Sequence, residues 1–246
     1  MLEWFTKRNE DKDLDLLDFS SLKTDVHSHL IPGIDDGSPD MGTTIGLIKK
    51  MQQLGFSKLI TTPHVMSDFY QNSSEIILSG LTNVRAELKT QNINMEIDAA
   101  AEYYIDYDFE KKIGEEKFLT FGENYILVEL SFMEAPKNIF DIIFKLQLEG
   151  YKVVLAHPER YMFFTMKDYE NLVNRGVFLQ INCLSIIGYY SEAIKKKVND
   201  LIANNMVSFL GSDCHNMHHA QLHKECQTKK AWHDLNTSGR LLNSAL

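Results

Sequence analysis

The sequence has few cysteines and no long apolar run, and both absences exclude functional classes. It contains 246 residues and only three cysteines, Cys183, Cys214 and Cys226, an odd number without CxxC spacing. A disulfide framework or a zinc–thiolate knuckle is therefore not expected, and a reducing compartment is the default. No apolar stretch is long enough for a signal-peptide core near the start or for a membrane span. These absences predict a cytoplasmic protein without membrane insertion.

Positive charge is also scarce. Lys and Arg total 25 against 34 Asp and Glu, which gives a formal net charge of −9, and the basic residues form no dense stripe. Proteins that bind nucleic acid obtain much of their affinity from basic surface that neutralises phosphates. We therefore expect no nucleic-acid partner.

The residues that are present predict an α/β fold. Hydrophobic residues make up 44% of the chain, an ordinary fraction for a protein with a full core. From Thr24 onward, short apolar runs alternate with longer helical patterns, which is the signal for βα units around a parallel sheet. The expected strands are 24–30, 58–64, 95–103, 125–130, 152–158, 177–183 and 206–213. The expected helices are 40–54, 73–90, 137–149 and 191–204, with one or two more after His218.

Seven strands in one unbroken series favour a closed or nearly closed (β/α) barrel. No Pro-, Ser- or Gly-rich linker divides the chain, and barrels of this length commonly form one domain. We expect a single domain over residues 24–246, preceded by an arm over residues 1–23 that packs on the body or contacts a partner. An open doubly wound sheet is the alternative, because periodicity cannot distinguish the two.

Residues with metal-ligand side chains stand at the ends of nearly every expected strand. Two pairs are spaced two apart, His27 with His29 and Asp213 with His215, so each pair is expected on one side of its strand. Asp35 and Asp36 follow the first strand. Single residues close the intermediate strands: His64, Glu102, Glu129 and His157. One HxH pair is more often ordinary, and a lone acid more often caps a helix. Their joint placement, at ends that meet on one face of a barrel, predicts a metal site.

The kind of metal follows from the donors. Imidazole and carboxylate ligands without thiolates suit Mn, Fe, Zn or Co better than a structural zinc or a calcium site. The ligand number exceeds what one ion needs, so two or three bridged ions are expected. Of the other histidines, His223 and His233 are expected at the surface. Mouth aromatics are expected to pack loops rather than bind substrate: Phe69, Tyr70, Phe132, Tyr161, Phe163 and Tyr189.

These motifs resemble a known family. DVHSHLIPGIDDGS, ITTPH, AAEYY, ILVELS, LAHPERY and GSDCHN, spread over residues 24–216, resemble the PHP (polymerase and histidinol phosphatase) superfamily. Within it they are similar to the manganese-dependent bacterial protein-tyrosine phosphatases of the CpsB/YwqE type, which are linked to capsular and exopolysaccharide synthesis. The resemblance implies a distorted (β/α)7 TIM-like barrel and a cytoplasmic hydrolase. It also implies Mn²⁺ as the cofactor and a phosphotyrosine-bearing protein as the substrate, such as the tail of a bacterial tyrosine kinase.

The resemblance also assigns roles to residues. It implies one ion held by His27, His29, Glu102 and Asp213, a second by Glu102, Glu129 and His157, and a third by Asp36, His64 and His215. Arg160 in HPER matches the family's phosphate-binding arginine. A second arginine expected after the DxH pair is missing, because that stretch reads NMHHAQ. His218 or His219 takes its place, or the substrate is held differently.

The expected reaction is attack of a metal-bridged hydroxide on phosphorus, with Arg160 neutralising phosphoryl charge. A cysteine mechanism requires an arginine six positions after the cysteine, and those positions hold Tyr189, Ala220 and Trp232. Three alternatives remain open. They are a small-molecule phosphatase of histidinol-phosphate type, a nuclease, which the charge of −9 disfavours, and a metal-binding scaffold without turnover.

Overall fold

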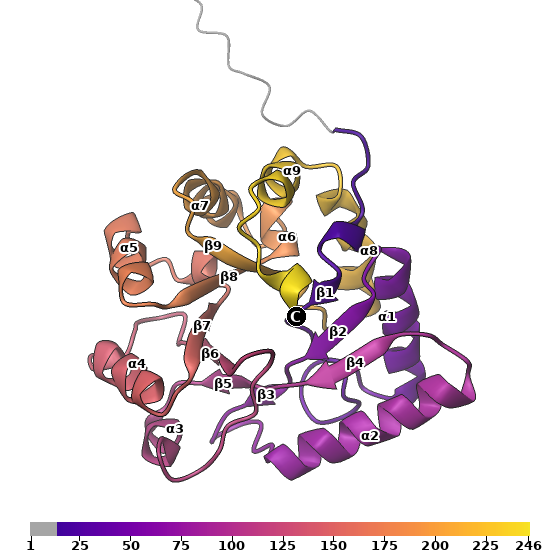
Figure 1. The fold of residues 1–246 in the computed structure, drawn as a ribbon, viewed down its shortest axis with the longest axis horizontal. Coiled ribbons are helices and arrows are strands. Elements are labelled where there is room, and N and C mark those ends of the chain that lie inside the picture. The colour runs from indigo at the N-terminus through magenta and orange to yellow at the C-terminus, as the bar shows by residue number, and fades with distance from the viewer. Residues whose placement is uncertain (1–13) are drawn as a thin grey trace, which may run out of the picture.

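The computed structural model describes residues 14–246 and has an α/β fold with two sheets, in which all strand pairs are parallel (Figure 1). The first sheet has the order β1-β2-β4 and consists of β1 (Thr24–Asp25), β2 (Lys58–Thr61) and β4 (Glu96–Ala99). The second has the order β3-β5-β6-β7-β8-β9. Its strands are β3 (His64–Val65), β5 (Glu102–Tyr104), β6 (Tyr125–Glu129), β7 (Lys152–Ala156), β8 (Phe178–Asn182) and β9 (Val207–Gly211). The predicted α/β class with parallel strands is confirmed.

Two of the expected strands are interrupted. The run 58–64 is divided between β2 and β3 at Thr62-Pro63, since proline has no amide hydrogen to donate within a sheet. The run 95–103 is divided opposite to it, between β4 and β5. The register nevertheless continues across the break, because Lys58 pairs with Glu96 and His64 pairs with Glu102 at the same offset. Backbone bonds from Glu102 N to Pro63 O (3.0 Å) and from Ala100 N to Thr61 O (2.9 Å) bridge the interruption.

The first and last strands also meet beyond their regular ends. β1 stops at Asp25 and β9 at Gly211, both shorter than expected from the sequence. Past these ends, Ser28 and Cys214 form a parallel bridge. The amide of Asp213 donates to His27 O at 2.7 Å, and the amide of His29 donates to Cys214 O at 3.0 Å. The two segments richest in histidine are therefore fixed side by side.

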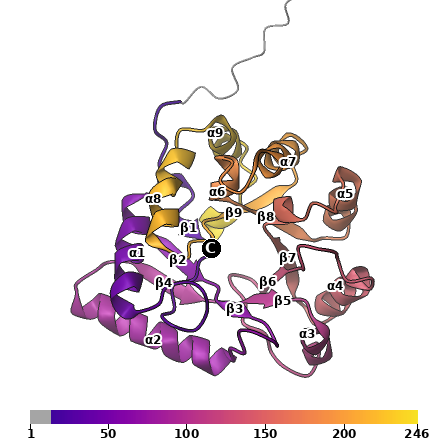
Figure 2. The same ribbon diagram turned by 180° about the vertical axis from the view of Figure 1, so that it is seen from behind.

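Helices cover the outside of the strands in both views (Figures 1 and 2). The four expected helices are confirmed to within two residues at each end: α1 (Met41–Gln53), α2 (Ser74–Thr90), α4 (Ile139–Leu148) and α7 (Glu192–Ala203). The tail forms α8 (Met217–Cys226) and α9 (Lys230–Thr237). Three shorter helices were not predicted: α3 (Tyr107–Lys112), α5 (Met166–Asn174) and α6 (Cys183–Ile186). Within residues 14–246, no helix combines the length and the apolar character that crossing a membrane requires.

Side-chain caps fix the starts of three of the four expected helices. The side chains of Asp40, Ser73 and Ser191 accept hydrogen bonds from the amides of Thr43, Ile76 and Ile194. Each cap satisfies an amide that has no partner inside the helix. These serine and aspartate residues therefore explain why the helix starts were readable from the sequence.

The core has two parts. The larger part lies between strands and helices, and the smaller one gathers apolar side chains from several strands, including Ile60, Val154 and Phe209. Leu242 and Leu246 of the C-terminal segment pack against the smaller part. This segment runs to the middle of the strands in Figure 1, where Asn243 binds Thr24 O and Leu210 O at 2.9 and 2.8 Å.

The described part of the expected arm, residues 14–22, packs on the body. The Phe19 ring, in the 3₁₀ turn η1 (Phe19–Ser21), stacks on Phe56 at 4.9 Å and meets Trp232 edge-on at 5.0 Å. The Trp232 indole donates to Leu17 O at 2.7 Å. Gly55 lies beneath this contact with φ +106°, and a Cβ there would stand 2.7 Å from Ser20 N. Residues 1–13 of the expected arm lie outside the described residues.

Replacing Phe19 with alanine tests whether this segment is part of the folding unit. Phe19 is completely buried, so we expect Phe19→Ala to lower the free energy of unfolding by about 3–5 kcal/mol. Leu16→Ala is the matched control, because Leu16 is 56% exposed. Urea titration followed by circular dichroism measures both. Equal stability of Phe19→Ala and wild type would show that residues 14–22 are dispensable.

Candidate metal centre

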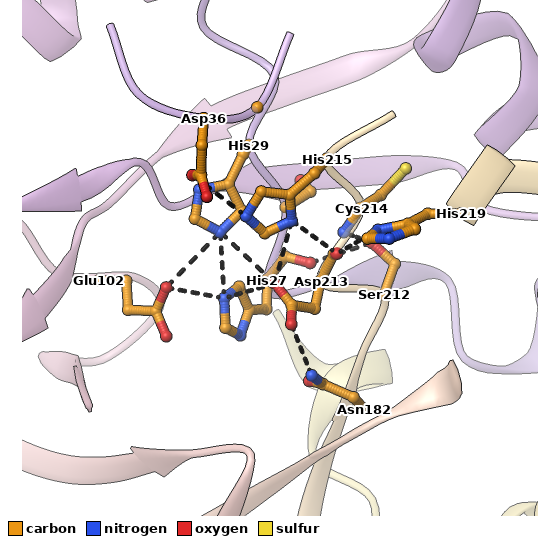
Figure 3. A network of polar contacts seen from close by, with 12 residues as sticks. His27, His29, Asp36, Glu102, Asn182, Ser212, Asp213, Cys214, His215 and His219 are labelled. Carbon is orange, nitrogen blue, oxygen red and sulfur yellow. Dashed lines mark hydrogen bonds and ion pairs between the residues drawn. The ribbon is translucent and has the colours of Figure 1, made fainter. Parts of the chain in front are cut away.

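The first histidine pair lies where β1 has ended and the chain meets the extension of β9. His27 and His29 are both fully buried, and their Nε2 atoms are 3.3 Å apart (Figure 3). The expectation that both imidazoles face the same side is confirmed.

Glu102, at the start of β5, is the acid at the middle of the cluster. Its Oε2 lies 3.1 Å from His27 Nε2 and 3.1 Å from His64 Nδ1. Its Oε1 lies 2.9 Å from His157 Nε2. His29 Nε2 also lies 3.5 Å from Oε2, so one fully buried carboxylate contacts four imidazoles that come from three different strand ends.

Asp213 closes the cluster on the β9 side. Its Oδ1 stands 3.5 Å from His27 Nε2 and 3.6 Å from His29 Nε2. We expected strand alternation to orient Asp213 and His215. This explanation is wrong, because β9 ends at Gly211 and Asp213 has φ +50°. His157, just past β7, has φ +33°. Left-handed backbone is uncommon for such residues and concentrates at functional sites.

The open end of the cluster is formed by Asp36 and two half-buried histidines. Asp36 Oδ1 lies 3.5 Å from His64 Nε2 and 3.4 Å from His215 Nε2. The rings of His29 and His215 stack at 3.9 Å. Glu129 reaches the same cluster from β6, with Oε1 3.1 Å from His64 Nδ1. The Asp36 side chain is 54% exposed, so the cluster opens to solvent here.

All nine residues expected as metal ligands are therefore brought together. Their ligand atoms form four groups, each within 4.8 Å. The groups are His29, Asp36, His64 and His215; His27, His29 and Asp213; His27, Glu102 and His157; and His64, Glu102 and Glu129. This grouping resembles the expected three-ion assignment but places His64 in two groups and separates Glu129 from His157. Which ion each residue holds stays a prediction.

Electrostatics couple the cluster into one unit. Burial lowers the pKa of His27, but the Glu102 and Asp213 carboxylates outweigh it and raise that pKa to about 10. Burial likewise raises the pKa of Glu102, but His27 and His64 outweigh it and hold that pKa well below its usual value. Burying so many charged groups is costly unless they are paired or coordinate metals. The mixed imidazole and carboxylate donors, whose ligand atoms gather within 4.8 Å of one another in each group, fit divalent ions.

Three further side chains orient the ligands. The Asp35 carboxylate lies 2.8 Å from His29 Nδ1, and Gln180 Oε1 lies 2.7 Å from His27 Nδ1. Asn182 Nδ2 donates to Asp213 Oδ2 at 2.6 Å. Such supporting bonds fix the ring orientation and tautomer of metal ligands. Asp35 was noted in the sequence, whereas Gln180 and Asn182 were not predicted. These two residues stand two apart at the end of an expected strand, and this spacing could have indicated that both side chains face the site.

The two candidate substitutes for the missing arginine differ in position. His219 lies beside the cluster, with Nδ1 3.4 Å from Asp213 O and its ring 5.8 Å from that of His215. His218 is exposed. Arg160, in the turn η2 (Pro158–Arg160), places its Nη1 atom 3.6 Å from Asp213 Oδ2.

One of the two other histidines expected at the surface was assigned wrongly. His223 is fully buried, and its Nε2 lies 2.9 Å from Ser212 O, because this face of α8 packs over the end of β9. His233 is partly exposed, which agrees with a surface position, and its Nε2 lies 3.2 Å from Gln227 O. Helical spacing alone did not reveal which face of each tail helix is covered.

Comparison with known proteins identifies relatives over most of the chain. The family model described as "Capsular polysaccharide synthesis, CpsB/CapC" matches residues 23–233. The tyrosine-protein phosphatase YwqE of Bacillus subtilis is 27% identical over 208 residues, covering 82% of this chain and 80% of that protein. The tyrosine-protein phosphatase CpsB of Streptococcus agalactiae serotype V is 24% identical over 201 residues, with 78% and 83% covered.

Solved structures agree with these matches. One comes from a study of YwqE from Bacillus subtilis and CpsB from Streptococcus pneumoniae, described as unique metal-dependent tyrosine phosphatases. It superposes with a TM-score of 0.79 at 25% identity and covers 90% of each chain. An amidohydrolase from Mycoplasma synoviae superposes with a TM-score of 0.54 at 12% identity, covering 96% and 89%. The second likeness concerns the fold alone.

Replacing Glu102 with glutamine tests its place at the middle of the cluster. Removing one charge while keeping the side-chain size should weaken Mn²⁺ binding by about 100-fold or more, since loss of a mere supporting residue already costs 10–100-fold. Glu170→Gln, at an exposed position of α5, is the control. Titration calorimetry with Mn²⁺ measures the affinity and the number of ions. Unchanged binding by Glu102→Gln would exclude Glu102 as a ligand.

Proposed function

The chain belongs to the CpsB/CapC family of capsular polysaccharide synthesis, and from this premise we propose that it is a metal-dependent phosphatase acting on phosphotyrosine in proteins. The family predicted from its motifs is confirmed. The observation that carries the function is the convergence of nine imidazole and carboxylate ligands beside Arg160. A histidine- and acid-rich cluster that is open to solvent and adjoins an arginine suits hydrolysis of a phosphate ester.

We infer further that the two sheets form one distorted (β/α)7 barrel over residues 24–246. Treating β2 with β3 and β4 with β5 as two interrupted strands leaves seven strand positions, and the bridge between Ser28 and Cys214 joins the first to the last. In such a barrel the carboxyl ends of all strands face one rim, where active sites are built. The cluster lies along those ends.

The cluster is suited to two or three divalent ions, and we propose Mn²⁺, with Fe, Zn or Co as alternatives. Asp36, Glu102, Glu129 and Asp213 together carry −4, against +6 for three divalent ions, so the loaded site would stay cationic and attract phosphate. Ions bound here would act as Lewis acids and would lower the pKa of a coordinated water toward about 7.

The chain's own residues have separate tasks in this reaction. Arg160 binds phosphoryl oxygens and neutralises the charge that develops on them, because its planar fork matches phosphate geometry. Gln180 and Asn182 hold His27 and Asp213 in their orientations. The leaving phenolate has a conjugate acid of pKa about 10, so it departs without strong protonation.

The partner we propose is a phosphotyrosine-bearing protein in the cytoplasm, such as the tail of a bacterial tyrosine kinase. The tyrosine-phosphatase relatives and the link of the family to capsule synthesis support this choice.

A cysteine nucleophile has no place in this mechanism. All three cysteines are buried, and burial raises the pKa of the Cys183 and Cys214 thiols well above its ordinary value. A thiol held neutral is a poor nucleophile.

We expect the triple variant Cys183→Ala, Cys214→Ala and Cys226→Ala to keep the wild-type kcat/KM on a phosphotyrosine peptide. Loss of a true covalent nucleophile costs about 10⁶-fold in a serine protease. Steady-state kinetics decide, with circular dichroism to verify folding. A folded variant with activity reduced on that scale would contradict a metal-dependent mechanism.

The central test compares wild type with His157→Ala on a tyrosine-phosphorylated peptide, with Mn²⁺ and with chelator. We expect chelator to abolish activity and His157→Ala to lose about 100-fold or more, since even indirect support of a metal site contributes 10–100-fold. His233→Ala, a histidine outside the cluster, is the control and should keep activity.

Full activity of a folded His157→Ala protein would contradict the ligand assignment. A strong preference for histidinol phosphate over the peptide would instead favour a small-molecule phosphatase at the same site.

A further inference from the structure

Arg160 packs against two aromatic rings. Its guanidinium carbon is 4.3 Å from the Phe132 ring centroid and 4.7 Å from the Tyr190 ring centroid. Phe132 follows β6 and Tyr190 follows α6, so the rings come from loops more than fifty residues apart in sequence, on either side of β7. Arg160 itself follows β7, so its contacts with the two rings connect the segments that follow β6, β7 and β8, three neighbouring strands of the sheet.

The contacts leave the edge of the guanidinium group available. Aromatic rings interact with the face of the planar group, whereas its N–H donors point outward in the plane. Within residues 14–246, the Arg160 guanidinium group makes a polar contact to Asp213, with Nη1 3.6 Å from Oδ2. The Arg160 side chain remains 25% exposed. It is therefore held at its faces while donors stay free for an incoming anion.

The two rings are themselves tied to the metal cluster. The Tyr190 hydroxyl lies 3.4 Å from Asp213 Oδ2, which also accepts the Asn182 amide at 2.6 Å. The Phe132 ring lies 5.8 Å from the His157 ring and 5.8 Å from that of Tyr161. Tyr161 is completely buried, and its hydroxyl oxygen accepts a hydrogen bond from the Leu130 amide at 2.9 Å. The rings therefore have fixed neighbours on the side away from solvent.

From this geometry we infer that Phe132 and Tyr190 are positioning residues that clamp Arg160 and aim its free donors at a phosphoryl group over the metal cluster. The inference deepens the proposed function and rests on it for the identity of the anion. An arginine side chain has many rotamers, and fixing it in advance reduces the entropy lost when the anion binds.

The test is the affinity of the Mn²⁺-loaded protein for inorganic phosphate, measured by titration calorimetry. Phe132→Leu and Tyr190→Leu remove the rings, whereas Phe132→Tyr and Tyr190→Phe retain them. We expect each leucine variant to lose about fivefold to thirtyfold in phosphate affinity, the range for partly desolvated cation–π contacts. The ring-retaining variants should stay close to wild type. Phe144→Leu, at an exposed position of α4, is the matched control.

A double-mutant cycle separates positioning from general packing. In an Arg160→Ala background, Phe132→Leu should have no further effect on phosphate affinity, because the group it positions is gone. The same loss in both backgrounds, or a wild type whose phosphate affinity does not depend on Arg160, would overturn the clamp. If the cycle behaves as expected but the wild type does not hydrolyse phosphotyrosine, the proposed function fails while the clamp stands.

Discussion

The structure depends on the contact of one buried carboxylate with four imidazoles. Glu102 lies within 3.5 Å of His27, His29, His64 and His157, which come from three different strand ends. Charged groups are tolerated in a buried site when they are paired, so the acids and the histidines have to contact one another. The requirement that such groups converge explains why the strand ends, rather than the helices, carry the residues with metal-ligand side chains.

The backbone is adapted to that convergence. The break at Thr62-Pro63 releases His64 from the first sheet while the strand register continues through β3 and β5. Left-handed conformations at His157 and Asp213 turn the chain directly after β7 and β9. Irregular backbone of this kind has a cost, and it persists where surrounding structure enforces it. Here the neighbouring strands, the supporting amides of Gln180 and Asn182, and the buried ion pairs provide that enforcement.

The site combines two kinds of recognition beside each other. The acid–histidine cluster suits cations, and the adjacent arginine suits the anion that those cations would attract. Asp213 belongs to both parts, because it contacts His27 and His29 on one side and Arg160 on the other. A change at Asp213 would therefore affect cation and phosphate binding together, whereas Phe132 and Tyr190 stand on the arginine side.

The sequence by itself determined the parallel α/β class, the four longer helices and the nine residues of the cluster, because apolar periodicity, helix caps and strand-terminal ligands are local signals. It could not reveal the strand breaks, the short helices, the burial of His223, or the role of Tyr190. Those features arise from contacts between segments distant in the chain, and no local pattern specifies which distant side chain will fill a given space. Only the tertiary structure decided that two loops would enclose Arg160.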